Sequence, residues 1–238
     1  MSERDEAAMP EPASEEPRQP ERQEKKRPFW QEAILILVSA LVLALVLKTL
    51  VVQSFFIPSA SMEPTLVGSP DGPKDRILVQ KVSYWAGDIQ RGDIVVFADP
   101  GGWLPAAETG QPRNIIQRGL ESVGLYPAGG HVIKRVIGLG GDRVQCCDGG
   151  GRVRVNGVPL DEPYLADPTS GRQKTFDVTV PDGRLWLMGD NRGNSQDSRF
   201  HQDDLGGGSV DADLVVGKGW AILWPWDRAG KIAATGGD

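Results

Sequence analysis

The sequence predicts a mainly β domain preceded by one membrane-spanning helix. Three observations support this fold class: a single long apolar run near the N-terminus, several short apolar or alternating runs after it, and frequent turn residues, with 30 Gly and 18 Pro in the chain. Short runs bounded by Gly, Pro and Asp are typical of antiparallel sheets. Long helical periodicity is scarce beyond the first run, so the bulk of the chain should be β.

Residues 1–28 are predicted to form a disordered cytoplasmic tail. Glu, Arg, Pro, Ser and Gln dominate this segment, and it holds too few apolar residues to offset the entropy of ordering. Its charges alternate in sign, and the whole chain carries a formal net charge of −6. A nucleic-acid partner is therefore not expected.

The apolar run 29–52 is predicted to be the transmembrane helix, since about 20 apolar residues cross the hydrocarbon core. Three basic residues, 25–27, precede it, whereas no charge follows Lys48 until Glu63. This asymmetry keeps the N-terminus cytoplasmic and places the rest of the chain outside. A cleaved signal peptide is the competing interpretation, but the run is longer than a usual signal core and follows a long polar tail.

The remainder, 53–238, should be an extracytoplasmic β-rich domain. Asn156-Gly157 between alternating residues is a strong hairpin signal, because a type I′ turn needs positive φ at both central positions. This hairpin falls in a predicted smaller β subdomain at about 141–185, whereas 99–130 is rich in Gly and Pro and is interpreted as a surface insertion with one short helix at 114–123. The predicted strands are 76–82, 93–97, 132–137, 175–180 and 185–187.

The two cysteines, Cys146 and Cys147, are adjacent. Across a trans peptide their Cα atoms would lie about 3.8 Å apart, below the usual disulfide range. A vicinal disulfide in a turn and a pair of free thiols both stay open. Neither His131 nor His201 has a spacing that forms a metal site with them, so no metal or other cofactor is expected.

Near the C-terminus, the apolar segment 220–226 is too short to cross a membrane. It is either the closing strand of the sheet or an aromatic rim at the membrane interface, and the strand is favoured.

The candidate chemistry is a serine nucleophile with a lysine base. A serine hydroxyl needs a base within hydrogen-bond reach and donors for the developing oxyanion. His131 and His201 are poorly placed as bases, at a strand edge and in a polar loop. Lys134 lies within an apolar strand, where desolvation lowers the pKa of its ammonium group. Ser61 follows the apolar run, although taken alone it could merely cap a turn, and Lys134 could be a surface lysine.

Four segments together resemble the successive motifs of bacterial type I signal peptidases, in the same order: 59–66, 91–97, 134–142 and 189–199. The resemblance implies a signal-peptidase-like antiparallel β catalytic domain with a smaller β insertion subdomain. It also implies a serine endopeptidase of the bacterial cell membrane, anchored by a single span, that removes N-terminal signal peptides from exported preproteins. Cleavage would follow an Ala-x-Ala type of sequence and need no cofactor.

The resemblance also implies residue roles. Ser61 would attack the scissile carbonyl, Lys134 would take and return its proton, and the Ser59 hydroxyl would join the Ser61 N–H in the oxyanion hole. Ser195 would orient the lysine.

A further implied role is structural. Asp197, with Arg135 and Arg199 as ion partners, would hold that wall of the site in place.

The implied partners are secretory preproteins and the lipid bilayer. The substrate would bind as an extra strand, with alternate side chains entering shallow apolar pockets. The predicted pocket residues are Phe55, Ile57, Pro58, Met62, Val132 and Ile133.

Three other hypotheses remain. One is a membrane-anchored β domain that binds exported proteins without cutting them. The second is a self-cleaving Ser-Lys protein of the repressor type, which the apolar run and the missing DNA-binding helices disfavour. The third is a maturation peptidase dedicated to one substrate.

Overall fold

The structure, a computed structural model, describes residues 28–69, 72–81, 89–104, 130–167 and 174–233. The chain packs as two compact units that divide between Ala40 and Leu41. The predicted tail, and the helix predicted at 114–123, lie outside the described residues.

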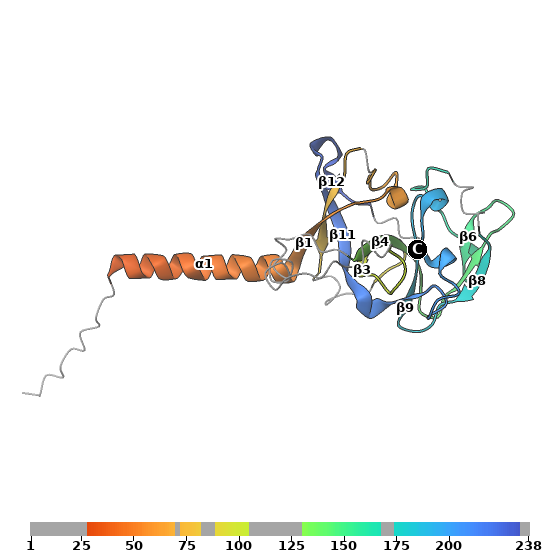
Figure 1. The fold of residues 1–238 in the computed structure, drawn as a ribbon, viewed down its shortest axis with the longest axis horizontal. Coiled ribbons are helices and arrows are strands. Elements are labelled where there is room, and N and C mark those ends of the chain that lie inside the picture. Colours follow the sequence, from red (N-terminus) through yellow and green to blue (C-terminus); the bar gives the residue numbers. More distant parts are fainter. Residues whose placement is uncertain (1–27, 70–71, 82–88, 105–129, 168–173, 234–238) are drawn as a thin grey trace, which may run out of the picture. The chain divides into compact units, whose positions relative to one another are not determined.

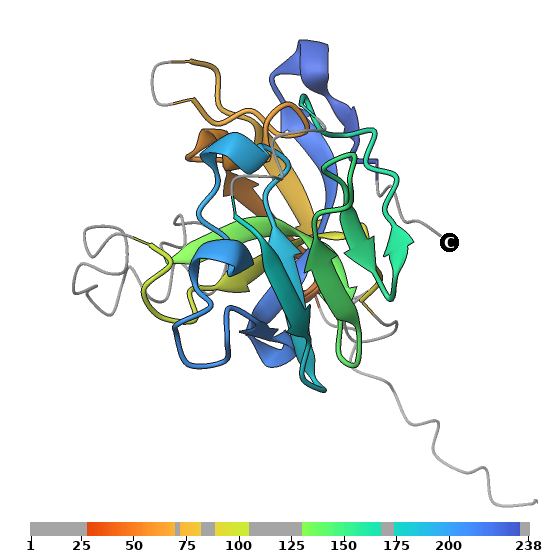
Figure 2. The same ribbon diagram turned by 90° about the vertical axis from the view of Figure 1, so that its right-hand side faces the viewer.

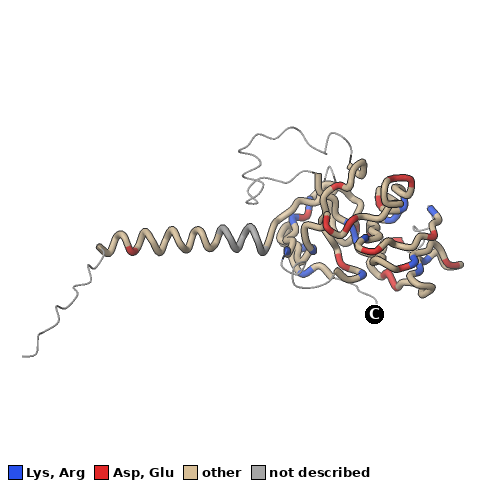
Figure 3. Tube along the Cα trace, turned by 90° about the horizontal axis from the view of Figure 1, so that it is seen from below, with Lys and Arg blue, Asp and Glu red and all other residues tan. Residues whose placement is uncertain are grey.

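Helix α1 spans Phe29–Val51, and Glu32 lies in its first turn. Glu32 is the charged position among residues 29–44 of the helix (Figure 3), and Lys48 follows near the C-terminal end of its sequence. Over the residues whose side chains the structure describes, which include 29–44 of this helix, no helix is both long enough and apolar enough to span a membrane. The helix gives way to a strand at Val52, so the predicted C-terminal bound of the helical run, residue 52, is one residue too long.

The larger sheet is antiparallel and has eight strands, in the order β1-β2-β11-β3-β4-β9-β10, with β12 paired to β11 (Figure 1). Its strands come from segments far apart in the sequence. Their bounds are Val52–Phe56 for β1, Arg76–Gln80 for β2, Ile94–Ala98 for β3, His131–Leu139 for β4, Arg184–Met188 for β9, Val210–Asp211 for β10, Val215–Trp224 for β11 and Gly230–Lys231 for β12.

The core lies on both faces of this sheet. Alternate residues of a strand point to opposite faces, and strand β3 shows the result: Ile94 and Val96 join one buried cluster, whereas Val95 and Phe97 join another. Apolar residues are therefore needed at every position of this strand. This explains why its sequence reads as a continuous apolar run rather than an alternating one.

The smaller sheet is also antiparallel, with the order β7-β6-β5-β8. It packs over Trp186 and Ile137 of the larger sheet through a third buried cluster, and Figure 2 shows its strands β5 (green) and β8 (teal) side by side. Both sheets belong to one compact unit, so a separate smaller subdomain stays a prediction. The strand bounds are Arg143–Cys146 for β5, Val153–Val155 for β6, Val158–Pro159 for β7 and Phe176–Thr179 for β8.

The predicted hairpin joins β6 to β7. Asn156 and Gly157 have φ angles of 51° and 84°, as the turn requires. At the end of β5, Cys146 and Cys147 are disulfide-bonded to each other, with Cα atoms 3.0 Å apart. The peptide bond between them is cis rather than trans, so the distance assumed from the sequence was wrong and the vicinal disulfide is the alternative that the structure shows.

Short 3-10 helices complete the described chain. Their bounds are Ala60–Met62 for η1, Arg192–Asn194 for η3, Ser198–Phe200 for η4, Ala212–Leu214 for η5 and Trp226–Arg228 for η6.

All five predicted strands are present within two residues at each end. In the apolar segment 220–226, residues 220–224 form the end of β11 as favoured, whereas Trp226 begins η6. Strands β1, β5, β10 and β12 were not predicted from the sequence.

Candidate active site

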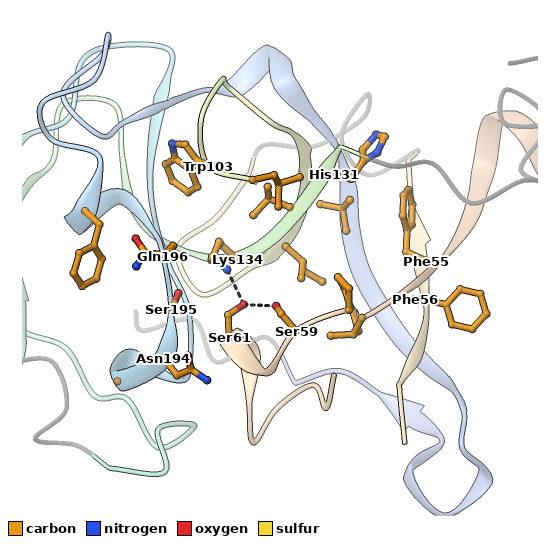
Figure 4. A pocket seen from close by; sticks show the side chains of 18 residues that line it. Phe55, Phe56, Ser59, Ser61, Trp103, His131, Lys134, Asn194, Ser195 and Gln196 are labelled. Atoms are coloured by element: carbon orange, nitrogen blue, oxygen red, sulfur yellow. Dashed lines mark hydrogen bonds between the residues drawn. The ribbon is translucent and has the colours of Figure 1, made fainter. Parts of the chain in front are cut away.

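The site centres on Ser61 and Lys134, which lie 73 positions apart in the sequence. The Nζ atom of Lys134 donates a hydrogen bond of 2.7 Å to the Oγ atom of Ser61 (Figure 4). Ser61 lies in η1, shortly after β1, whereas Lys134 lies in the middle of β4. The two residues are 7% and 4% exposed. The structure therefore joins the two residues that sequence analysis selected separately.

Lys134 lies on a strand that is buried at every position from 132 to 138, and this strand is paired with β3 and, from Arg135 onward, with β9. Burial lowers the pKa of Lys134 from its ordinary value of 10.5 to about 8, and the carboxylates of Asp197 and Asp190 oppose this shift. A neutral amine is thus accessible near physiological pH. A neutral lysine can accept the proton of a serine hydroxyl.

Ser59 lies on the other side of the nucleophile. Its Oγ atom donates a hydrogen bond of 3.2 Å to the Oγ atom of Ser61. Ser59 immediately precedes η1, in an extended conformation. A hydroxyl at this position is close enough to reach a carbonyl oxygen under attack by Ser61, as an oxyanion donor must.

The turn that carries Ser61 is held from behind by the loop after β9. The Asn191 N–H donates to the carbonyl oxygen of Ser61 at 3.1 Å, and its side-chain amide donates to the carbonyl oxygen of Ala60 at 3.1 Å. Gly189 lies against the same turn, where a Cβ atom would overlap the Ser61 carbonyl and the Ser195 hydroxyl. Sequence analysis quoted Asn191 within a motif but assigned it no role.

A buried ion pair fixes β4 to this loop. The guanidinium of Arg135 donates to both carboxylate oxygens of Asp190, at 2.8 and 2.7 Å, and both side chains are fully buried. Thr65 donates to the same carboxylate at 2.6 Å. The predicted Arg135 pairing with Asp197 is wrong. Successive residues of a strand point to opposite faces, so Arg135 bonds to Asp190 whereas Lys134 bonds to Ser61, although the Asp190 charge also acts on Lys134.

Asp197 pairs with Arg199 as predicted. The Nε and Nη2 atoms of Arg199 lie 2.8 and 2.9 Å from the two carboxylate oxygens, and both side chains are fully buried. Burial alone would raise the pKa of Asp197, but the hydrogen bonds and charge of Arg199 hold it below its ordinary value. Asp197 also accepts a hydrogen bond from the Gly189 N–H at 3.0 Å, which links this pair to the nucleophile turn.

The hydroxyl of Ser195 bonds neither to the Asp197–Arg199 ion pair nor to Lys134. Its Oγ atom is buried and makes no hydrogen bond within the part of the chain that the structure describes. The predicted bond from Ser195 to Lys134 is therefore not formed here, and Ser61 is the hydrogen-bond partner of the lysine.

A cavity of about 380 Å³ opens beside Ser61 and Lys134. Five of the six predicted pocket residues line it: Phe55, Ile57, Pro58, Val132 and Ile133.

The sixth predicted pocket residue, Met62, is not among the lining residues. It is fully buried in the core cluster that includes Ile57 and Ile133.

The cavity also includes Trp103, Leu104, Gln196 and Phe200, which sequence analysis missed. None of the four carries a local pattern that would mark it as part of a site. Only the fold brings them to the pocket.

Comparisons with known proteins agree with this geometry. The family model described as "Signal peptidase, peptidase S26" matches residues 30–224. The chain is 37% identical to a probable signal peptidase I of Mycobacterium leprae, covering 89% of this chain and 81% of that protein. It is 39% identical to a signal peptidase I of Mycobacterium tuberculosis, covering 88% and 78%. It is also 35% identical to the probable signal peptidase I-2 of Synechocystis, covering 85% and 77%. This chain belongs to the signal peptidase family, peptidase S26.

Proposed function

We propose that this protein is a serine endopeptidase that removes N-terminal signal peptides from exported preproteins, with Ser61 as nucleophile and Lys134 as general base. The observation that carries the proposal is the buried hydrogen bond of 2.7 Å between the lysine amine and the serine hydroxyl. The relatives named signal peptidase I support the choice of substrate.

The reaction proceeds through an acyl-enzyme. Neutral Lys134 takes the proton of the Ser61 hydroxyl as its oxygen attacks the scissile carbonyl. The Ser59 hydroxyl and the Ser61 N–H hold the oxyanion. The lysine ammonium then protonates the leaving amine, which releases the mature chain. In the second half, Lys134 activates a water molecule that hydrolyses the ester.

Asp197, Arg199, Arg135 and Ser195 act on the shape of the site rather than on the reacting atoms. The two buried ion pairs fix β4 and the loop after β9 relative to the nucleophile turn. We expect the Ser195 hydroxyl, which lines the same cavity as Lys134, to accept a hydrogen bond from the lysine once the Ser61 proton has moved, because the lysine then carries more protons to donate.

Substrate selection follows from the apolar part of the cavity. Phe55, Ile57, Pro58 and Ile133 form a surface that suits small side chains one and three residues before the cut, as in Ala-x-Ala. The Val132–Lys134 stretch of β4 is paired to β3 on one side only in the registers of the described strands. A substrate strand can pair along its other side.

Helix α1 is proposed to anchor the protein in the bacterial cell membrane. Its 23 residues extend for about 35 Å at 1.5 Å per residue, which matches a hydrocarbon core of about 30 Å. The basic residues 25–27 place the N-terminus in the cytoplasm and the catalytic domain outside. Resistance of the protein to carbonate extraction, with protease access to the catalytic domain from the outside only, tests this arrangement.

The function is tested by cleavage of a secretory precursor whose signal ends in Ala-x-Ala, in detergent, with the purified full chain. The parent should cut after the second Ala, whereas Ser61→Ala and Lys134→Ala should each lose ~10⁴-fold or more in rate.

Matched controls are Ser54→Ala, at an exposed position of β1, and Lys231→Ala, at an exposed position of β12. Both should cut at the parent's rate. A folded parent that binds the precursor but leaves it intact would instead favour a non-cleaving binder of exported proteins.

A further inference from the structure

The cavity has two halves, one on each side of the Ser61–Lys134 pair. Figure 4 shows Phe55 and Phe56 on one side of the pair and Trp103 and Gln196 on the other. All four residues line the same cavity. The half with Phe55 is the surface assigned above to residues before the cut. The other half has no assigned role.

The geometry of the reaction assigns a direction to the bound substrate. The scissile carbonyl oxygen must lie against Ser59, and the leaving nitrogen must lie against the Lys134 amine that protonates it. Ser59 lies on the Phe55 side of Ser61, whereas Lys134 lies toward Trp103 and Gln196 (Figure 4). The chain released by the cut therefore runs along the half that contains Trp103.

We propose that Trp103, Leu104 and Phe200 form a binding wall for an apolar side chain among the first three residues after the cut. The proposal rests on the proposed function, and it adds a second determinant of specificity to the residues before the cut. All three side chains line the cavity, and none is needed for the chemistry at Ser61.

The wall is rigid because Trp103 is held on several sides. Its ring packs edge-on to Phe97, with centroids 5.5 Å apart. It also stacks on the ring of His201, with centroids 4.6 Å apart and planes inclined by 10°. The Nδ1 atom of His201 lies 2.7 Å from a carboxylate oxygen of Asp204, which fixes the stacked ring.

The backbone of Trp103 is fixed as well, because its N–H donates to the Asp99 carboxylate at 3.1 Å. A wall that is already ordered loses little conformational entropy on binding, so contact with an apolar side chain adds to affinity. Trp103 is 8% exposed, which leaves one limited surface to contact the substrate.

The test compares peptides that share one Ala-x-Ala signal and carry either Leu or Ser at the first, second or third position after the cut. At one of these positions the parent should prefer Leu to Ser by about tenfold in kcat/KM. Trp103→Ala should bring that ratio close to one. Equal ratios in the parent and in Trp103→Ala at all three positions would overturn the proposal.

A matched control acts on the other half of the cavity. Phe55→Ala should change the preference for Ala over larger residues before the cut and leave the Leu-to-Ser ratio after the cut intact. If Phe55→Ala lowers that ratio as much as Trp103→Ala does, the wall is not specific for the released chain and the proposal is wrong.

Two additions keep the result decisive. Because Trp103 also packs on the core residue Phe97, Phe200→Ala provides a second variant, and it should lower the same ratio at the same position. Affinities of Ser61→Ala and Ser61→Ala/Trp103→Ala for the same peptides, measured by fluorescence anisotropy, test the wall without cleavage. If the double variant no longer discriminates Leu from Ser, the wall is supported even when no peptide is cut. Absence of cleavage would then count against the proposed function and not against the wall.

Discussion

The titration of Lys134 gives the sharpest prediction. Its pKa is about 8 rather than 10.5 because the amine is buried. At pH 7 about one-tenth of the protein then holds the neutral amine, compared with about 0.03% for an ordinary lysine, which is a difference of ~300-fold in active enzyme. The value of kcat/KM should therefore rise about tenfold per pH unit up to a midpoint near 8 and then level off.

The assay is the initial rate of precursor cleavage at low substrate concentration between pH 6 and pH 10. His131→Gln is a useful companion, because His131 lines the same cavity and has a titratable ring. The variant should keep the midpoint near 8. A midpoint near 10.5 would refute the burial argument, and a midpoint near 6.5 that disappears in His131→Gln would refute the lysine assignment.

The same shift affects stability. The pKa of Lys134 is lower in the folded state than in the unfolded state, so the unfolded state binds more protons between pH 8 and pH 10.5. Stability should therefore rise with pH across this window. The shift amounts to about 3 kcal/mol at 1.36 kcal/mol per unit. Urea unfolding at pH 7.5 and pH 10 should show this rise in the parent, and Lys134→Met should remove it.

Three further predictions concern the surroundings of the site. Asp197→Asn leaves Arg199 buried beside a neutral partner, so the free energy of unfolding should fall by about 3–5 kcal/mol in urea titrations. The double variant Asp197→Leu/Arg199→Met should recover most of the lost stability. A double variant as unstable as the single one would contradict the argument. Gly189→Ala places a methyl group against the Ser61 carbonyl and Ser195, so kcat should drop by ~10²-fold at unchanged secondary structure; normal kcat would show that the turn can move aside. Gly157→Ala puts a side chain at a φ of 84° and should cost about 1 kcal/mol in thermal unfolding without affecting cleavage; an equal loss of activity would show that the hairpin contacts the substrate.

Sequence patterns predict the strands well where local chemistry decides the structure. The Asn156-Gly157 turn needs positive φ angles that few residues tolerate, so the hairpin can be predicted from these two residues. Strand β3 is readable because it is buried on both faces. In contrast, β1 follows α1 directly, and its first residue, Val52, continues the apolar run of the helix. Only pairing with β2 makes Val52–Phe56 a strand, and such pairing has no local signal.

The site follows the same division. Ser61, Lys134 and Asp197 were predictable because their motifs occur together and in order. The partner of Arg135 was not, since the choice between Asp190 and Asp197 depends on which face of β4 each loop covers. Trp103 reaches the cavity by packing on Phe97 and His201. The stacking on His201 joins two segments that are far apart in the sequence, so no neighbouring residue indicates it.

The positions of Ser61 and Lys134 in the sheet have a consequence for when proteolytic activity begins. Ser61 follows the edge strand β1, Lys134 lies on β4, and the strands β2, β11 and β3 separate them in the sheet. Pairing of that series brings the two residues within hydrogen-bond distance. We therefore expect the protein to cleave substrates only once its β domain has folded.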